Sequence, residues 1–219
     1  AWEKGRISTG PEGYEPSFHK NHIIDLNRDA LEERFDVVAV SSVFYPLVAD
    51  KYWVLCVGNS VGRDFGPAVV SKNYKTPAEL EGKRVAVGGH PTTGSGLALM
   101  FCPGIELVEF PFDAIVDAIL NDEIDAGVMI HEELLYYEEK GLNLVLDLGV
   151  AWNEDTGLPL PVGLNIVSKR LGMETARDVA TACQDSLLWG VSHEEEVYAY
   201  ANGFGRGRAR DHVEMFRME

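Results

Sequence analysis

The stretch Asp125-Ala-Gly-Val-Met-Ile-His131-Glu-Glu-Leu-Leu-Tyr136 decides the fold class of this chain. An apolar run of strand length is followed directly by a histidine and then by helix-forming residues. This order is typical of a buried strand that delivers a side chain to the carboxyl edge of a parallel sheet, where open α/β folds bind their ligands. His131 is therefore a candidate for proton transfer, because histidine titrates near neutral pH. The alternative is that His131 caps the next helix or pairs with Glu132 or Glu133.

Strand and helix patterns alternate on both sides of this stretch. Strands are predicted at 84–88, 106–110, 125–130 and 143–148, and helices at 76–80, from about 97, at 111–121 and at 132–140. Strands separated by single helices of this length predict a parallel sheet with right-handed crossovers. The expected fold class is therefore α/β.

The flanking segments are less regular. We predict strands at 14–19, 35–40 and 51–57, a helix at 21–33 and another through 43–50, an irregular segment at 151–163, an extended run at 164–168, and helices over 172–219. The glycine-rich segment 58–67 does not have the spacing of a dinucleotide-binding or P-loop motif. We interpret it as a loop whose glycines need positive φ.

Two extended runs, 67–71 and 164–168, lead into and out of the middle section. They predict two lobes joined by two connectors: a discontinuous first lobe at 1–68 and 166–219, which we expect to lack its opening strand, and an inserted second lobe at 69–165. Two-lobed proteins of this plan bind their ligand in the cleft between the lobes.

The composition excludes several classes of partner. A net charge of −16 over 219 residues argues against nucleic acid and against an anionic membrane surface, since both require clustered Lys and Arg. No apolar stretch is long enough to span a bilayer, and the first residues do not resemble a signal peptide. Cys56, Cys102 and Cys183 form neither a metal pattern nor an even disulfide framework, so we expect reduced thiols, a cytoplasmic location and no metal.

The carboxyl ends of the predicted strands select the ligand-binding candidates. They are Ser41 and Ser42 in the first lobe, and Thr92, Thr93 and His131 in the second. The threonine pair comes just before a predicted helix, where hydroxyls and free backbone N–H groups together can hold a carboxylate. The alternative is plain N-capping by one threonine. We favour ligand contact, because a cap uses only one hydroxyl.

Several segments, in order, resemble the 1,4-dihydroxy-6-naphthoate synthase family of the futalosine pathway to menaquinone, which is related to chorismate dehydratase. They are Phe35-Asp-Val-Val-Ala-Val-Ser41 with Tyr45, Gly66-Pro67, Val85-Ala-Val-Gly-Gly-His-Pro-Thr-Thr93, Asp125 to Glu132, Leu146-Asp-Leu-Gly149 with Trp152, and Thr156-Gly-Leu-Pro-Leu-Pro161. The resemblance covers most of the chain.

This resemblance implies a periplasmic-binding-protein type 2 fold used as a cytosolic carbon–carbon lyase without a cofactor. The family's proton acceptor matches His131, and its substrate contacts match Thr92, Thr93 and a strand end, Ala39 to Ser41. The implied substrate is a small carboxylate, cyclic dehypoxanthinyl futalosine, which is cleaved to 1,4-dihydroxy-6-naphthoate.

One departure from the family pattern leaves the substrate open. Some members carry a lysine where this sequence has Ala39. The alternative function is therefore a non-catalytic solute-binding protein for a small carboxylate, which would bind without turnover. A homodimer is a further expectation about partners.

Overall fold

The computed structural model describes residues 1–8, 10–130 and 137–203, and these residues form two compact units. Unit 1 contains 1–40, 46–59 and the chain from 164 onward, and unit 2 contains 41–45 and 60–163. The predicted lobes change at 68 and 166, whereas the units change at 59 and 163. The segment 41–45 also groups with unit 2, because its side chains pack and hydrogen-bond there.

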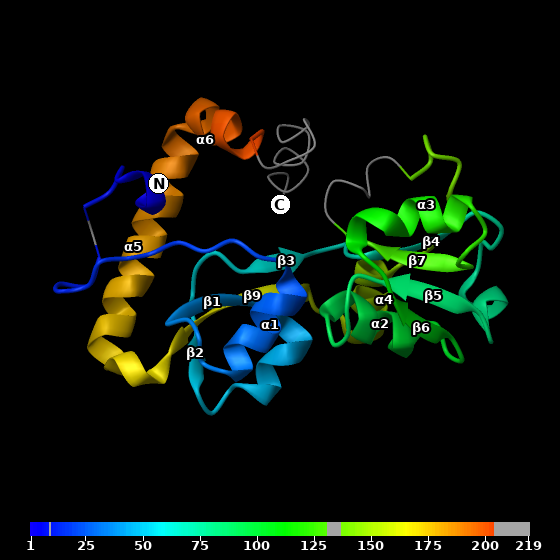
Figure 1. Cartoon of the computed structure of the whole chain (residues 1–219), viewed down its shortest axis with the longest axis horizontal. Helices are drawn as coiled ribbons and strands as arrows, with labels where there is room; N and C mark the ends of the chain where they lie inside the picture. Colours follow the sequence, from blue (N-terminus) through cyan, green and yellow to red (C-terminus); the bar gives the residue numbers. More distant parts are fainter. Residues whose placement is uncertain (9, 131–136, 204–219) are drawn as a thin grey trace. The chain divides into compact units, whose positions relative to one another are not determined.

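Unit 2 is built on a five-stranded sheet with the order β6-β5-β7-β4-β8 (Figure 1). The strands are β4 Ala68–Ser71, β5 Arg84–Val87, β6 Glu106–Glu109, β7 Ala126–Met129 and β8 Asn143–Asp147. β5 pairs in parallel with β6 and β7, as the sequence predicts. β4 runs antiparallel to both β7 and β8, so the sheet is mixed rather than purely parallel. The α/β class is confirmed.

Side chains on the strands of this sheet alternate between two apolar cores, because successive residues of a strand point to opposite faces. Val69 and Val85 belong to the core under α2 (Thr93–Phe101) and α4 (Leu148–Thr156). Val70 and Ala86 belong to the core under α3 (Ile115–Leu120). Figure 1 shows α3 on one side of the sheet and α2 and α4 on the other. The central strands β4 and β7 are buried along their whole length, and with β5 they hold the start of α2 at a fixed position.

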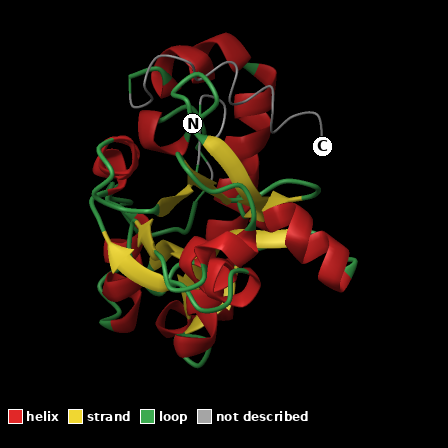
Figure 2. Ribbon diagram, turned by 90° about the vertical axis from the view of Figure 1, so that its right-hand side faces the viewer, coloured by secondary structure: helices red, strands yellow, loops and turns green. Residues whose placement is uncertain are grey.

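Unit 1 has a smaller core. Its strands β1 (Val37–Ser41) and β2 (Tyr52–Val54) flank β9 (Leu160–Ser168), and the first residues of β9 also pair with β3 (Ser60–Gly62) in unit 2. Its helices are α1 (Ile23–Leu31), α5 (Gly172–Ser192) and α6 (Glu194–Ala201). Leu55, Val167, Ala176 and Val179 form the buried cluster between β2, β9 and α5. Figure 2 distinguishes the helices, strands and connecting loops of the residues that the structure describes.

Short 3-10 helices complete the described elements. They are η1 Trp2–Lys4, η2 Ser42–Leu47, η3 Pro77–Leu80, η4 Phe112–Ala114 and η6 Lys169–Leu171. The predicted helices at 43–50 and 76–80 are therefore 3-10 turns, and the one at 111–121 is η4 followed by α3. Of the helix predicted at 132–140, residues 132–136 lie outside the described part, and 137–141 form a turn. Of the predicted C-terminal helices, 204–219 also lie outside it.

Two further sequence predictions of local structure are wrong. Residues 14–19 form no strand, and 148–156, most of which was predicted to be irregular, form helix α4. The start of α4 depends on Asp147, whose carboxylate accepts hydrogen bonds from the N–H groups of Gly149 and Val150 at 2.8 and 3.1 Å. Burial raises the pKa of this carboxyl, although those two hydrogen bonds and a third from the Gly66 N–H act to lower it.

The glycine-rich segment 58–67 has two requirements for glycine rather than one. Gly58 has φ 75°, as the predicted loop needs. Gly66 has no positive φ, but a Cβ there would lie 2.7 Å from the backbone nitrogen of Gly149. A side chain would push the segment away from the first turn of α4, because backbone atoms cannot move aside as a flexible side chain does. Close backbone approach therefore explains this glycine.

Candidate functional site

The loop between β5 and α2 carries the predicted threonine pair at the carboxyl end of a central strand. Thr92 is the N-cap of α2, and its hydroxyl accepts a hydrogen bond from the Ser95 N–H at 3.3 Å. Ser95, which is fully buried, accepts one from the Thr92 N–H at 2.9 Å. The alternative prediction, N-capping by one threonine, is therefore correct for Thr92. Thr93 is left for another role.

Thr93 lies next to Ser42, 51 positions earlier in the chain, with 3.1 Å between their hydroxyl oxygens. The Thr93 hydroxyl donates to the Val162 carbonyl at 2.7 Å, and the Ser42 hydroxyl donates to the Pro161 carbonyl. Each hydroxyl has one proton, and the two carbonyls use both. Both oxygens therefore keep lone pairs, and in this arrangement they offer a ligand acceptors rather than donors.

Backbone N–H groups at the start of α2 provide the donors for an anion. Thr93 and Gly94 are the first two residues of the helix, so their N–H groups have no acceptor inside it. The positive end of the helix dipole adds to the attraction for a carboxylate. The predicted carboxylate would therefore bind to the N–H groups of Thr93 and Gly94, and the hydroxyls of Ser42 and Thr93 lie beside these N–H groups.

The other predicted residues are less well connected. Ala39 lies in the middle of β1 and is half-buried, and Ser41 is the last residue of β1 and is buried. The predicted base, His131, lies outside the described residues. The structure thus brings together Ser42 and Thr93, with Thr92 next in the chain, and their contact with a ligand stays a prediction.

Two residues of this region were not predicted as functional. The His90 ring lies 3.0 Å from the Ser95 hydroxyl through Nδ1, and the His90 N–H donates to the Glu109 carboxylate at 3.0 Å. The only sequence signal was the position of His90 two residues before the threonine pair. Glu109 gives no such signal, because its contact depends on the pairing of β5 with β6.

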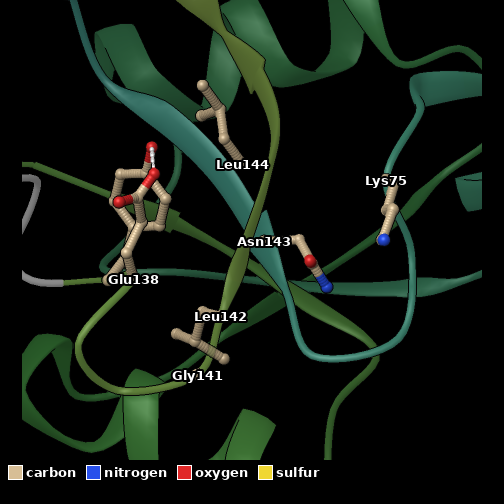
Figure 3. A pocket seen from close by; sticks show the side chains of 7 residues that line it. Lys75, Glu138, Gly141, Leu142, Asn143 and Leu144 are labelled. Atoms are coloured by element: carbon tan, nitrogen blue, oxygen red, sulfur yellow. Dashed lines mark hydrogen bonds between the residues drawn. The ribbon is translucent and has the colours of Figure 1, made fainter.

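A separate hollow of about 430 Å³ lies beside the edge strand β8. Its lining residues are Lys75, Tyr137, Glu138, Gly141, Leu142, Asn143 and Leu144. Figure 3 shows Lys75 and Glu138 on either side of the strand that carries Asn143 in this view. The Asn143 amide already donates to the carbonyls of Ser71 and Lys72. None of the predicted site residues lines this hollow.

The described ranges 1–8, 10–130 and 137–203 contain no candidate metal centre and no candidate membrane-spanning helix. There, no three His, Cys, Asp or Glu side chains gather as metal ligands. No helix within those ranges is long and apolar enough to cross a membrane. The thiols of Cys56, Cys102 and Cys183 are all free.

Comparison with known proteins decides the family. The family described as "Menaquinone biosynthesis" matches residues 7–219. The chain belongs to this family. A 1,4-dihydroxy-6-naphthoate synthase from Thermus thermophilus is 39% identical over 176 residues, which are 80% of this chain and 64% of that protein. A second synthase, from Streptomyces coelicolor, is 33% identical over 75% of this chain and 60% of its own length.

Solved structures agree with the family's fold. The crystal structure of protein AF1704 from Archaeoglobus fulgidus has a TM-score of 0.91 and 37% identity, covering 99% of this chain and 80% of that one. The periplasmic aliphatic sulphonate binding protein SsuA from Escherichia coli has a TM-score of 0.60 at 12% identity, covering 82% of this chain and 64% of that one. The predicted periplasmic-binding-protein-like fold is confirmed.

Proposed function

We propose that this menaquinone-biosynthesis family member is a carbon–carbon lyase, a 1,4-dihydroxy-6-naphthoate synthase that acts on cyclic dehypoxanthinyl futalosine. The observation that carries the proposal is the family match over 7–219, together with 39% identity to a synthase. The chain spans about 64% of that relative's length, so the activity, the substrate and the absence of a cofactor are inferences about this chain.

The hydrogen bonds at the start of α2 suggest how the substrate is held. The N–H groups of Thr93 and Gly94 bind the substrate carboxylate. The hydroxyls of Ser42 and Thr93 accept hydrogen bonds from substrate hydroxyl groups, because their own protons go to the carbonyls of β9. Ala39, in the middle of β1, and Ser41, at its end, are the further substrate contacts that the resemblance implies. A fixed carboxylate holds the reacting carbon in one place, which is the contribution of binding to the rate.

His131 is the proposed proton acceptor. It follows β7, which pairs with β5 on one side and with β4 on the other. The strand that precedes His131 is therefore the central strand of the sheet. Its role rests on its place in the sequence and on the resemblance. The neutral imidazole takes a proton from the bound substrate as the carbon–carbon bond breaks, and a sugar-derived fragment leaves.

The decisive test is an assay of the purified chain with cyclic dehypoxanthinyl futalosine, measuring naphthoate release by absorbance and mass spectrometry. We expect turnover by the wild type and a loss of about 10²- to 10⁴-fold in kcat for His131→Ala, the range typical of a general base. His193→Ala, between α5 and α6, is the matched control and should leave kcat unchanged. No product from the wild type would refute the activity, and equal rates would refute the base.

The substrate-binding role of Thr93 is tested by an isosteric pair of variants. Thr93→Val removes the hydroxyl that donates to the Val162 carbonyl and keeps the shape, whereas Thr93→Ser keeps the hydroxyl. We expect Thr93→Val to lower kcat/KM by about 10- to 100-fold and Thr93→Ser to stay within about threefold, because Val leaves a substrate hydroxyl without its acceptor, at a cost of about 1–3 kcal/mol. Equal values for both variants would remove the hydroxyl from the proposal.

The second candidate function is a solute-binding protein for a small carboxylate, which the likeness to SsuA favours at the level of fold. Such a protein would bind the same compound tightly in calorimetry and release no product over hours. Turnover in the assay above would reject it. Homodimerisation, the cytoplasmic location and the predicted cleft between lobes stay predictions.

A further inference from the structure

His90 is the residue that ties the α2 loop to two neighbouring elements. Its backbone N–H donates to Glu109, the last residue of β6, at 3.0 Å. Its ring Nδ1 lies 3.0 Å from the hydroxyl of Ser95 in the first turn of α2. The loop that ends in Thr92 is therefore fixed at His90 on one side to the sheet and on the other to the helix.

The hydrogen bonds of Ser95 indicate which partner donates. The Ser95 oxygen accepts from the Thr92 N–H at 2.9 Å, and its hydroxyl donates to the Thr92 carbonyl at 3.0 Å. One hydroxyl has one proton, so a bond from Ser95 to His90 would break the bond to the Thr92 carbonyl. All three contacts are served together only when Nδ1 of His90 carries a proton and donates to Ser95.

The consequence for Thr92 and Thr93 follows from the same bonds. Ser95 closes the capping box with Thr92, and the next residue, Thr93, carries the hydroxyl that meets Ser42 and the Val162 carbonyl. The Thr92 hydroxyl also lies 3.2 Å from the Ser95 oxygen, but its one proton is used when it donates to the Gly89 carbonyl at 3.1 Å. A donor at the His90 position then fills the remaining lone pair of Ser95 and keeps the Ser95 proton on the Thr92 carbonyl. The direction of the Thr93 side chain is thereby coupled to the ring of His90.

We propose that His90 is a positioning residue, whose Nδ1–H donates to Ser95 and holds the Thr92–Thr93 turn in its substrate-binding arrangement. The binding part of this inference rests on the proposed function. His90 takes no part in the chemistry, and its effect is on KM more than on kcat.

Three substitutions at this position separate donor from acceptor. His90→Asn places an amide N–H near the Nδ1 position, His90→Asp places only acceptors there when ionised, and His90→Ala places neither. We expect KM for cyclic dehypoxanthinyl futalosine to rise about 3- to 10-fold in His90→Ala and His90→Asp, the range that one hydrogen bond contributes. His90→Asn should stay within about twofold, and kcat should change by less than about twofold in all three. Rescue by Asp instead of Asn would overturn the proposal.

A ligand-free measurement keeps this inference separate from the proposed function. The nitrogen chemical shifts of the His90 ring in the full 219-residue chain should report a protonated Nδ1 at neutral pH. Amide exchange at Thr92 and Ser95, whose N–H groups bond each other's hydroxyls, should be faster in His90→Ala and not in His90→Asn. A bare Nδ1, or unchanged exchange in His90→Ala, would refute the positioning role even if the lyase assay succeeds. Both results could hold even if that assay fails.

Discussion

The two ends of helix α2 lie in different surroundings: hydrogen-bonding groups surround the first turn, and an apolar core surrounds the last. At the first turn, Thr92, Thr93 and Ser95 are buried or half-buried, and each has hydrogen-bond partners in neighbouring segments. At the other end, Ala98 in the last turn and Cys102 at the C-cap lie in the apolar core with Val85 and Val145. Both ends bury polar side chains, but the hydroxyls of the first turn have hydrogen-bond partners, whereas the Cys102 thiol lies among apolar side chains. The properties of a buried hydroxyl or thiol therefore depend on its neighbours more than on its residue type.

We expect the largest effect on stability at the apolar end of α2, from the Cys102 thiol. Burial raises the pKa of the Cys102 thiol to about 11, so the folded state favours the protonated form. A raised pKa contributes stability below the unfolded-state value near 9, and this stability is lost as pH rises toward 11. Each pKa unit is worth about 1.4 kcal/mol, so we expect roughly 2 kcal/mol of extra destabilisation at pH 11.

Denaturant unfolding of the wild type and Cys102→Ala at pH 8 and pH 11 measures this difference, because Tyr and Lys titrate equally in both proteins. The loss of free energy of unfolding should be about 2 kcal/mol smaller in Cys102→Ala. Equal losses would mean that the thiol is not desolvated. Cys56, which is exposed, serves as the control through Cys56→Ala and should not alter the pH dependence.

Two glycines of α2 sharpen the contrast at the first end. A Cβ on Gly94 would lie 2.9 Å from the Val128 side chain, which is buried, whereas a Cβ on Gly96 would lie 3.3 Å from the exposed Val43. We expect Gly94→Ala to lower the free energy of unfolding by about 1–2 kcal/mol, since overpacking exceeds the gain in helix propensity. Gly96→Ala should be neutral or stabilising. Thermal or urea unfolding of the pair would contradict this if the order reversed.

The smallest effect concerns Ser42. Ser42→Ala removes the donor to the Pro161 carbonyl and one neighbour of Thr93, so we expect a loss of about 1 kcal/mol in the free energy of unfolding. Ser192 also donates to backbone carbonyls, but it is exposed, and Ser192→Ala should cost less than about 0.5 kcal/mol. Urea titration resolves the two values. A larger loss for Ser192→Ala would mean that the Ser42 bond does not form.

The sequence was informative where one local rule acts alone. The strands at 84–87, 106–109 and 126–129 were predicted from short apolar runs, because a buried strand needs little else. The beginning of α2 was placed near 97 instead of 93, since Gly94 and Gly96 have low helix propensity and hid the first turn. The capping bonds between Thr92 and Ser95 outweigh that propensity.

Features that depend on distant contacts were not predictable. Helix α4 was missed because polar residues at 153–156 look like a loop, while its start is fixed by Asp147 and by the close approach of Gly66. The antiparallel direction of β4 follows from where the chain enters the sheet, which no local pattern records. Likewise, Thr93 was recognised, but its pairing with Ser42 across 51 positions could not be read from either residue.

Strand β9 has a consequence for how the protein is made. Its first residues, 160–163, belong to unit 2, and from 164 onward it belongs to unit 1. During synthesis, all five strands of the larger sheet have therefore been made by residue 147, whereas the sheet of unit 1 lacks β9 until Ser168 has emerged. Domains generally fold as units as the chain emerges. We therefore expect unit 2 to fold first, and unit 1 to fold only after the end of β9 and helix α5 have been synthesised. Truncation within 164–175, which removes part of β9 or the α5 residues Ala176 and Val179 of the unit 1 cluster, would on this account spare the first folding event and abolish the second.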